Sequence, residues 1–207
     1  FKKEDGLADE PKVLCLGAYG EGMDFFRLKG AVEAILQEIR AENVTFEAVT
    51  DNPSYHPGRC ARVLADGKEV GVFGQIHPLT ARNYDVDTEL YCAELSFDGL
   101  FAAQGGQPVY QPLPRFPSVT RDIAVVCDET VTVGRLEETI RKGAQGLLKE
   151  VSLFDIYRGK GIDAGKKSVA FSQTLRSDER TLTDADSDGE VKAVLEKLET
   201  TLGARLR

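Results

Sequence analysis

Apolar and polar residues alternate most regularly in the second half of the chain. Period-two alternation is typical of strands, and apolar residues every three or four positions are typical of helices. Thr132 can cap the first helix of this half. One apolar stripe marks the last helix, at Val191, Leu195, Leu198 and Leu202. The elements alternate as strand, helix, strand, strand, helix, strand, at residues 121–127, 132–142, 150–157, 168–175, 190–202 and 204–207.

This order is typical of the ferredoxin-like βαββαβ fold, an antiparallel sheet with helices on one face only. Because neighbouring strand residues point to opposite faces, the alternation also predicts which side chains meet the helices. Those are Ile123, Val125, Phe154, Ile156, Val169 and Phe171. The helix-free face is predicted to carry Asp122, Ala124, Asp155, Tyr157, Ser168, Ala170 and Ser172.

The small and polar side chains around one tyrosine allow two interpretations of the helix-free face. An unpaired nucleobase can stack on such a ring and be bound through hydrogen bonds. Alternatively, the face is simply solvated and the tyrosine has no special role. Basic residues at the strand ends and in the loops are candidate phosphate contacts, namely Arg121, Arg158, Lys160, Lys166, Lys167, Arg176 and Arg180.

The first half is predicted to form a second module, built on an antiparallel sheet. An amphipathic helix over 24–41 carries its apolar residues on one side, so it can dock on that sheet. Asp66-Gly67 is a strong signal for a hairpin turn between two strands. The pattern predicts strands at 12–16, 44–49, 61–65, within GKEVGVFGQIHP and from Tyr84 to Cys92 and beyond. The module therefore belongs to the α+β class.

A linker is predicted where the pattern weakens. The stretch AAQGGQPVYQPLPRFP, residues 102–117, contains two glycines and four prolines between clear strands. We therefore expect a first module at 1–101, a linker at 102–114 and a second module at 115–207.

The composition is that of a folded protein, since 42% of the 207 residues are hydrophobic and 29% are charged. The net charge of -8 argues against nucleic-acid binding, because phosphates attract Lys and Arg. The excess acidity is confined to residues 1–113, which carry 10 basic and 18 acidic side chains, whereas residues 114–207 carry 16 of each. The charge of the second half therefore permits RNA binding there.

The location of the chain is suggested by what its sequence lacks. No apolar run approaches the roughly 18 residues of a membrane span, and the opening FKKEDGLADEPKV contains no apolar signal-peptide core. We expect a cytoplasmic protein without membrane contact. Because the chain opens with Phe, we also expect its first module to be cut from a longer polypeptide.

The cysteines and histidines do not have the spacing of a metal site. Cys15, Cys60, Cys92 and Cys127 stand far apart, and His56 and His77 are the only histidines. Cys15, Cys92 and Cys127 fall in strand-like apolar runs, so we expect buried, reduced thiols, no disulfide and no metal. Each histidine lies beside a proline, which favours a loop or capping role over catalysis.

Three segments resemble ligand loops but lack the required spacing. RGKGIDAGKKS, residues 158–168, fails the Walker pattern and joins two strands rather than a strand and a helix. GAYGEG, residues 17–22, places its glycines at the wrong intervals for a dinucleotide site. TDADSDGE lacks the glutamate that completes a calcium loop. Its acidic residues are better explained as the negative first turn of the last helix.

Specific phrases of the second half resemble a known family. RFPSVTRDIAVV, LFDIYRGKGIDAGKKSVAF, RTLTD and the final LR, in that order over 115–207, resemble the ferredoxin-fold anticodon-binding domain of the phenylalanyl-tRNA synthetase β subunit. The phrases DFFRLKG, YHPGRCA and VGVFGQIHP resemble the module that precedes it in that subunit. The resemblance implies that the first module has a class II synthetase-like fold without catalytic residues. The sequence shows no recognisable GxGxxR motif, which agrees with that absence.

The resemblance also implies site residues and partners. The positions that match the family's anticodon contacts are Ala124, Asp155, Tyr157 and Ser168. Tyr157 is expected to pack against or hydrogen-bond to a base, Asp155 and Ser168 to hydrogen-bond to base edges, and Ala124 to leave space. The implied partners are tRNA(Phe) and the catalytic α subunit in an α2β2 enzyme, with no DNA. ATP and Mg²⁺ would act through the α subunit, so no cofactor and no catalysis are expected in this chain.

Two other classes of function remain as alternatives. A ferredoxin-like sheet can also form a ligand-sensing regulatory module, because a fold alone does not determine function. A hydrolase or phosphatase on the same fold would need a catalytic arginine or histidine beside the first strand, where only Arg115 and Arg121 lie.

Overall fold

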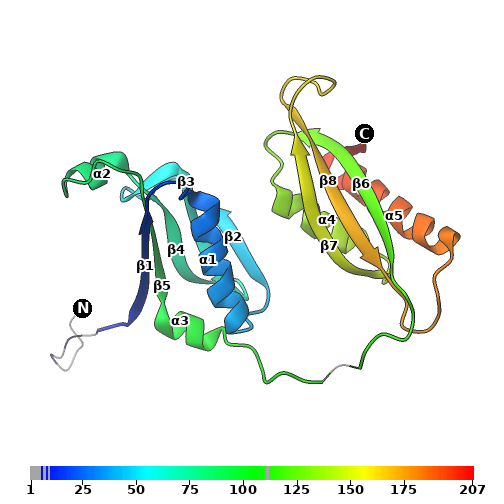
Figure 1. The fold of residues 1–207 in the computed structure, drawn as a ribbon, viewed down its shortest axis with the longest axis horizontal. Helices are drawn as coiled ribbons and strands as arrows, with labels where there is room; N and C mark the ends of the chain where they lie inside the picture. Colours follow the sequence, from blue (N-terminus) through cyan, green and yellow to red (C-terminus); the bar gives the residue numbers. More distant parts are fainter. Residues whose placement is uncertain (1–5, 7, 9, 111) are drawn as a thin grey trace. The chain divides into compact units, whose positions relative to one another are not determined.

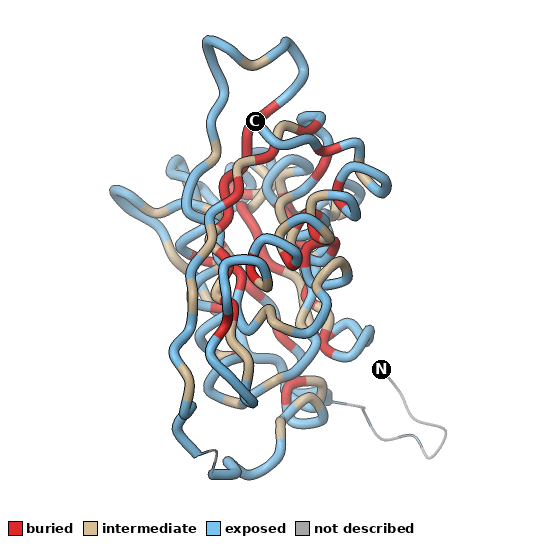
Figure 2. Tube along the Cα trace, turned by 90° about the vertical axis from the view of Figure 1, so that its right-hand side faces the viewer, coloured by how far each residue is buried: buried red, intermediate tan, exposed pale blue. Residues whose placement is uncertain are grey.

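The computed structural model describes residues 6, 8, 10–110 and 112–207, and the chain forms two compact units, 1–109 and 110–207 (Figure 1). The expected cut at Phe1 lies outside the described residues. Buried residues, red in Figure 2, are interspersed with exposed ones along most of the strands and helices, whereas the inner strand β8 (Lys166–Leu175) is buried at consecutive positions. The interspersed pattern is that of elements that are covered on one side only.

The first unit is an α+β module around a five-stranded antiparallel sheet of order β1-β5-β4-β3-β2. Its strands are β1 (Val13–Tyr19), β2 (Val44–Ala48), β3 (Tyr55–Ala65), β4 (Lys68–Ile76) and β5 (Leu90–Ser96). Its helices are α1 (Phe25–Glu38), α2 (Pro78–Arg82) and α3 (Phe97–Ala102). The predicted α+β class and antiparallel sheet are confirmed.

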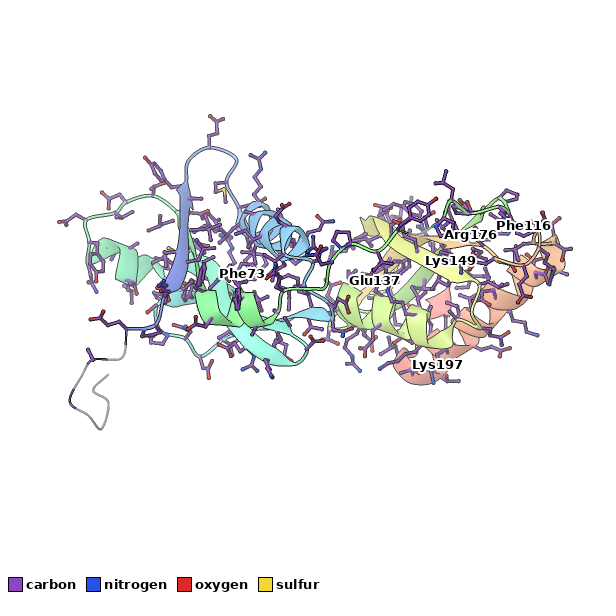
Figure 3. The ribbon with its side chains drawn as sticks, turned by 90° about the horizontal axis from the view of Figure 1, so that it is seen from below. Phe73, Phe116, Glu137, Lys149, Arg176 and Lys197 are labelled. Carbon is purple, nitrogen blue, oxygen red and sulfur yellow. The ribbon has the colours of Figure 1, made fainter. Side chains whose placement is uncertain are left out.

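The core of the first unit forms where α1 docks on the sheet. Asp24 caps the helix by accepting a hydrogen bond from the Arg27 amide at 2.8 Å. The helix then buries one stripe, Leu28, Val32 and Leu36. Phe73 of β4, labelled in Figure 3, is fully buried and stacks on Phe25 with ring centroids 5.1 Å apart. The amphipathic pattern thus correctly predicts which side of α1 is covered.

The hairpin between β3 and β4 turns at Asp66-Gly67, as predicted. Both residues have positive φ, 49° and 73°, the conformation that a two-residue turn between twisted strands requires. The pairing of Ala65 with Lys68 closes the turn.

Two segments of the first unit differ from the prediction. The strand expected from Tyr84 begins only at Leu90, because a turn continues from the end of α2: the Tyr84 amide donates to the Ala81 carbonyl at 3.0 Å and Asp85 has a positive φ of 57°. A helix, α3, follows β5 directly and extends to Ala102, the first residue of the predicted linker, because Ser96 caps it. Both helices are short, which makes their sequence periodicity weak.

The second unit has the predicted βαββαβ order and an antiparallel sheet of order β7-β8-β6-β9. The elements are β6 (Val119–Asp128), α4 (Val133–Gly143), β7 (Leu148–Tyr157), β8 (Lys166–Leu175), α5 (Asp184–Leu202) and β9 (Arg205–Leu206). Both helices lie behind the sheet in the view of Figure 1. They share one core with the strands, in which Leu136 and Val194 meet Val125, Val169 and Phe171. Within residues 112–207, no helix lies on the opposite face of the sheet.

Helix α5 begins six residues before the predicted start, at Asp184 instead of Glu190. Thr183 caps it in a capping box, in which the Asp186 carboxylate also accepts a hydrogen bond from the Thr183 amide at 2.8 Å. Asp184 and Asp186 therefore form an acidic first turn, as predicted, and stabilise the positive end of the helix dipole.

A β-bulge in β7 corrects the prediction for Phe154. Leu153 pairs with Phe171 and Asp155 pairs with Ala170, so β7 has one more residue than β8 in this interval. Phe154 is that extra residue and is 59% exposed, so its prediction as a core residue is wrong. Ile156, beyond the bulge, does pack on the core.

The cysteines are free thiols, but they are not equally buried. Cys60 and Cys127 are buried and Cys92 is half-buried, whereas Cys15 is exposed. The prediction that Cys15 is buried is wrong, because it lies on the edge strand β1 and points away from the core of the first unit. Burial raises the pKa of Cys60 and of Cys92 to about 11.

Candidate nucleic-acid interface

The helix-free face of the second unit brings the four candidate contact residues onto two adjacent rungs of the sheet. Asp155 of β7, Ala170 of β8 and Ala124 of β6 are opposite one another on the first rung. Tyr157, Ser168 and Val126 form the next rung. Neighbouring strands lie about 4.8 Å apart, so the four candidates lie within one patch of nucleobase dimensions.

The bulge at Phe154 is what places Asp155 and Tyr157 on this face. Val151, before the bulge, is an odd-numbered residue and is buried against the helices. If Phe154 were paired as a regular strand residue, strict alternation would place Tyr157 on that same side. The bulge reverses the alternation, so Ile156 faces the core and its two neighbours face away from it.

The patch has a closed floor between more exposed residues. Asp155 is exposed and Tyr157 is 37% exposed, whereas Ser168 is only 3% and Ala170 only 8% exposed. Ala124 is half-buried. The floor is therefore made of small side chains, which leave room above them for a flat group.

The Tyr157 ring is held from two sides. Its hydroxyl donates a hydrogen bond to the Lys160 carbonyl at 3.3 Å. A Cβ on Gly159 would lie 2.9 Å from that hydroxyl, so only glycine fits beside it without a shift, and its φ of +159° also favours glycine. Above the ring, the Arg207 guanidinium carbon lies 5.2 Å from the ring centroid, within the range of a cation–π contact.

The candidate phosphate contacts divide by their present partners. Lys167 is 6% exposed and donates from Nζ to the Glu129 carbonyl at 2.9 Å, so it does not belong to an exposed basic surface. It pairs with Cys127 on the core-facing side of β8, a placement that the loop-like sequence before it concealed. The exposed candidates, in contrast, are Arg158, Lys160, Lys166 and Arg180.

Several of the basic side chains on and around this sheet form ion pairs with acidic residues. Arg158 binds Glu129 at 2.8 Å and thereby lowers the pKa of that carboxyl. The half-buried Arg121 binds Asp184 at 2.8 Å, which ties β6 to the start of α5. Arg176 and Lys149, both labelled in Figure 3, bind Asp178 at 3.4 and 2.8 Å. Arg180 binds Asp186 at 2.6 Å. A phosphate would compete with a carboxylate at each of these positions.

The histidines cap turns, as predicted. Nδ1 of His56 accepts a hydrogen bond from the Gly58 amide at 3.0 Å, and Nδ1 of His77 accepts one from the Leu79 amide at 3.2 Å. Across residues 6, 8, 10–110 and 112–207, no three His, Cys, Asp or Glu side chains are placed to hold a metal ion. Within the same residues, no helix is long and apolar enough to cross a membrane.

Family models match both halves of the chain. Residues 114–207 match the ferredoxin-fold anticodon binding domain, and residues 1–97 match the phenylalanyl tRNA synthetase beta chain CLM domain. The phenylalanine–tRNA ligase beta subunit of Clostridium tetani is 39% identical over 204 residues, which are 99% of this chain and 26% of that protein. The chain belongs to the phenylalanyl-tRNA synthetase β-subunit family.

Other members of the family are similar over the same region. The beta subunit of Symbiobacterium thermophilum is 41% identical over 212 residues, covering 97% of this chain and 24% of that protein. The beta subunit of Halalkalibacterium halodurans is 43% identical over 188 residues, which cover 90% of this chain and 23% of that protein. The chain thus spans about a quarter of the length of these relatives. The family predicted from the sequence phrases is therefore confirmed.

Sequence reasoning missed Arg207 as a residue of the candidate interface. The family resemblance included the final LR as a phrase, but nothing in that phrase indicates a contact with Tyr157, 50 positions earlier. The strand order β7-β8-β6-β9 decides that contact, and strand order is not a local property of the sequence.

Proposed function

We propose that the chain takes part in the ATP-dependent attachment of phenylalanine to tRNA(Phe), by binding RNA rather than by catalysis. The second unit binds the anticodon region. One observation carries this proposal, namely that Ala124, Asp155, Tyr157 and Ser168 occupy two adjacent rungs of a face that no helix covers.

The four residues suit the recognition of an unpaired base. The Tyr157 ring offers a stacking surface, and the exposed Asp155 carboxylate accepts hydrogen bonds from a base edge. Ser168 can donate or accept such a bond, and Ala124 leaves space for the ring. Lys160 and Lys166 are exposed phosphate contacts, and Arg158 and Arg121 become available if their bonds to Glu129 and Asp184 open.

The first unit has a structural role in this proposal. It is a class II synthetase-like module without catalytic residues, it packs on the catalytic α subunit of a cytoplasmic α2β2 enzyme, and residues 102–114 link it to the second unit. The match of residues 1–97 to a synthetase beta chain domain supports this assignment. ATP and Mg²⁺ act in the α subunit. A ligand-sensing function is not favoured, because the model that matches residues 114–207 is an anticodon-binding domain.

The direct test compares tRNA(Phe) binding by the α subunit plus full-length β subunit, with and without residues 115–207. Tyr157→Ala in the complete enzyme should weaken binding by about 1 to 3 kcal/mol, the range for one base–aromatic stack. Phenylalanine activation, measured by pyrophosphate exchange, should be unchanged. Tyr157→Phe, which keeps the ring, is the matched control. Equal tRNA affinity of Tyr157→Ala and the unmodified enzyme would exclude this site.

A further inference from the structure

Two residues of the helix-free face are buried although no helix covers them. Ser168 and Ala170 are 3% and 8% exposed, and both point away from the core that α4 and α5 form with Val169 and Phe171. On a sheet face open to water, small side chains in an inner strand are ordinarily accessible. Something other than a helix must therefore cover them.

Tyr157 and Arg207 are placed to be that cover. Tyr157 lies on β7, at one edge of the sheet, and Arg207 directly follows β9, at the other edge. The Arg207 amide donates to the Ala124 carbonyl at 2.9 Å, so Arg207 continues the rung of Ala124, Ala170 and Asp155. The two edges are about 14 Å apart, three strand spacings.

The contact between these residues therefore spans the sheet. The guanidinium carbon of Arg207 lies 5.2 Å from the centre of the Tyr157 ring. Since the strands β8 and β6 lie between the two backbones, the side chains can meet only above these strands. The residues beneath this Tyr157–Arg207 bridge are Ser168, Ala170 and Ala124, which explains why the first two are buried.

We infer that Arg207 is a further RNA-binding residue, whose guanidinium occupies, in the free protein, the space over Tyr157 that a base takes in the complex. This inference rests on the proposed function. A base that stacks on Tyr157 and contacts Ser168 requires the bridge to open. The displaced guanidinium then lies at the rim of the bound nucleotide and pairs with an RNA phosphate.

Opening the Tyr157–Arg207 bridge replaces one weak contact with two stronger ones. An exposed cation–π contact is weak, and a base–aromatic stack together with an Arg–phosphate pair replaces it. The neighbouring Arg205 is not equivalent, because it binds Glu199 at 3.0 Å, on α5. Arg205, two residues before Arg207, therefore serves as a matched control.

The bridge can be tested without RNA. In the 207-residue chain labelled with ¹⁵N, the Arg207 Nε–H resonance should lie upfield of an ordinary arginine, because the Tyr157 ring current acts on it. Tyr157→Leu should return it to the ordinary position. The same resonance position in both proteins would show that the bridge does not form and would overturn the inference.

The role in RNA binding is tested by salt dependence. We expect Arg207→Ala, in the enzyme assembled with the α subunit, to reduce the slope of log affinity for tRNA(Phe) against log salt by about 0.7, the value for one phosphate contact of a single strand. Arg207→Lys should keep the slope, and Arg205→Ala should not change it. An unchanged slope for Arg207→Ala, together with weakened binding by Tyr157→Ala, would overturn the role of Arg207 alone. If Tyr157→Ala also had no effect, the proposed function would fail with it.

Discussion

The two sheets of this chain use the same architecture but present different chemistry on the face turned away from their helices. In the first unit, one rung places Glu47, Arg62, Val72, Glu94 and Cys15 side by side across five strands. Arg62 binds Glu47 at 2.8 Å and approaches Glu69 at 3.9 Å, so acidic neighbours neutralise its charge. In the second unit, the corresponding face has a floor of small residues under Tyr157 and Arg207.

The difference shows that the side chains of the uncovered face, rather than the fold, decide what a sheet can bind. A rung rich in carboxylates repels phosphates. The second sheet supplies an aromatic ring, hydrogen-bonding groups and space. These groups favour the proposed base contact on the second sheet over one on the first.

The largest expected effect concerns the two cores. Phe73 in the first unit and Phe171 in the second are both fully buried. Replacing either one with alanine should reduce the free energy of unfolding of its own unit by about 3 to 5 kcal/mol, the usual cost of such a cavity. Hydrogen exchange resolved by residue should show the loss confined to the mutated unit. Equal loss of protection in both units would contradict the assignment of a separate core to each.

A smaller effect is expected from filling the floor of the second sheet. Ala170→Leu should place a large side chain where the base enters and weaken tRNA(Phe) binding by the assembled enzyme roughly tenfold or more, as when one stacked base is lost. Val72→Leu, in the central strand of the first sheet, is the matched substitution and should leave tRNA affinity unchanged. Thermal unfolding of both variants controls for the cost of overpacking. Undiminished binding by a folded Ala170→Leu variant would argue that bases do not enter above β8.

The smallest effect is a pH dependence that belongs to the second unit. Hydrogen bonds from Arg180 and from Thr183 hold the pKa of Asp186 far below its ordinary value. A carboxyl whose pKa is lowered in the folded state stabilises the protein at pH values above its ordinary pKa of about 4. That stabilisation is lost as the pH falls below this value. Asp186→Asn should thus lower the unfolding midpoint at pH 7 but have less effect near pH 2. Chemical denaturation at both pH values measures this, and Arg180→Gln should show the same trend.

Local patterns of the sequence predicted most of this fold because local forces determine most of it. The stripe of α1, the Asp66-Gly67 turn and the alternation in β6 and β8 each depend on residues a few positions apart. The acidic start of α5 was recognised for the same reason, although its first residue was placed too late.

The errors arise where distant residues decide. The alternation of β7 predicts Phe154 in the core, because a bulge depends on the partner strand, which that alternation alone does not reveal. The sequence predicts Lys167 as a candidate phosphate contact, although its buried ammonium binds the Glu129 carbonyl, 38 positions away. The contact of Arg207 with Tyr157 needs the order of all four strands. The sequence thus predicts the candidate contact residues, but it does not reveal that Tyr157 and Arg207 meet above Ser168 and Ala170.

The bulge at Phe154 makes the pairing of β7 as important as its composition. Regular pairing that kept Phe154 in the ladder would leave every contact residue in the sequence, yet it would turn Asp155 and Tyr157 inward and Ile156 out to solvent. A polar and an aromatic group would then enter a dry core, while the open face would receive an isoleucine. Deletion of Phe154 itself would instead make the pairing continuous and leave Asp155 and Tyr157 on the open face, whereas one extra residue elsewhere between the bulge and Tyr157 would reverse them.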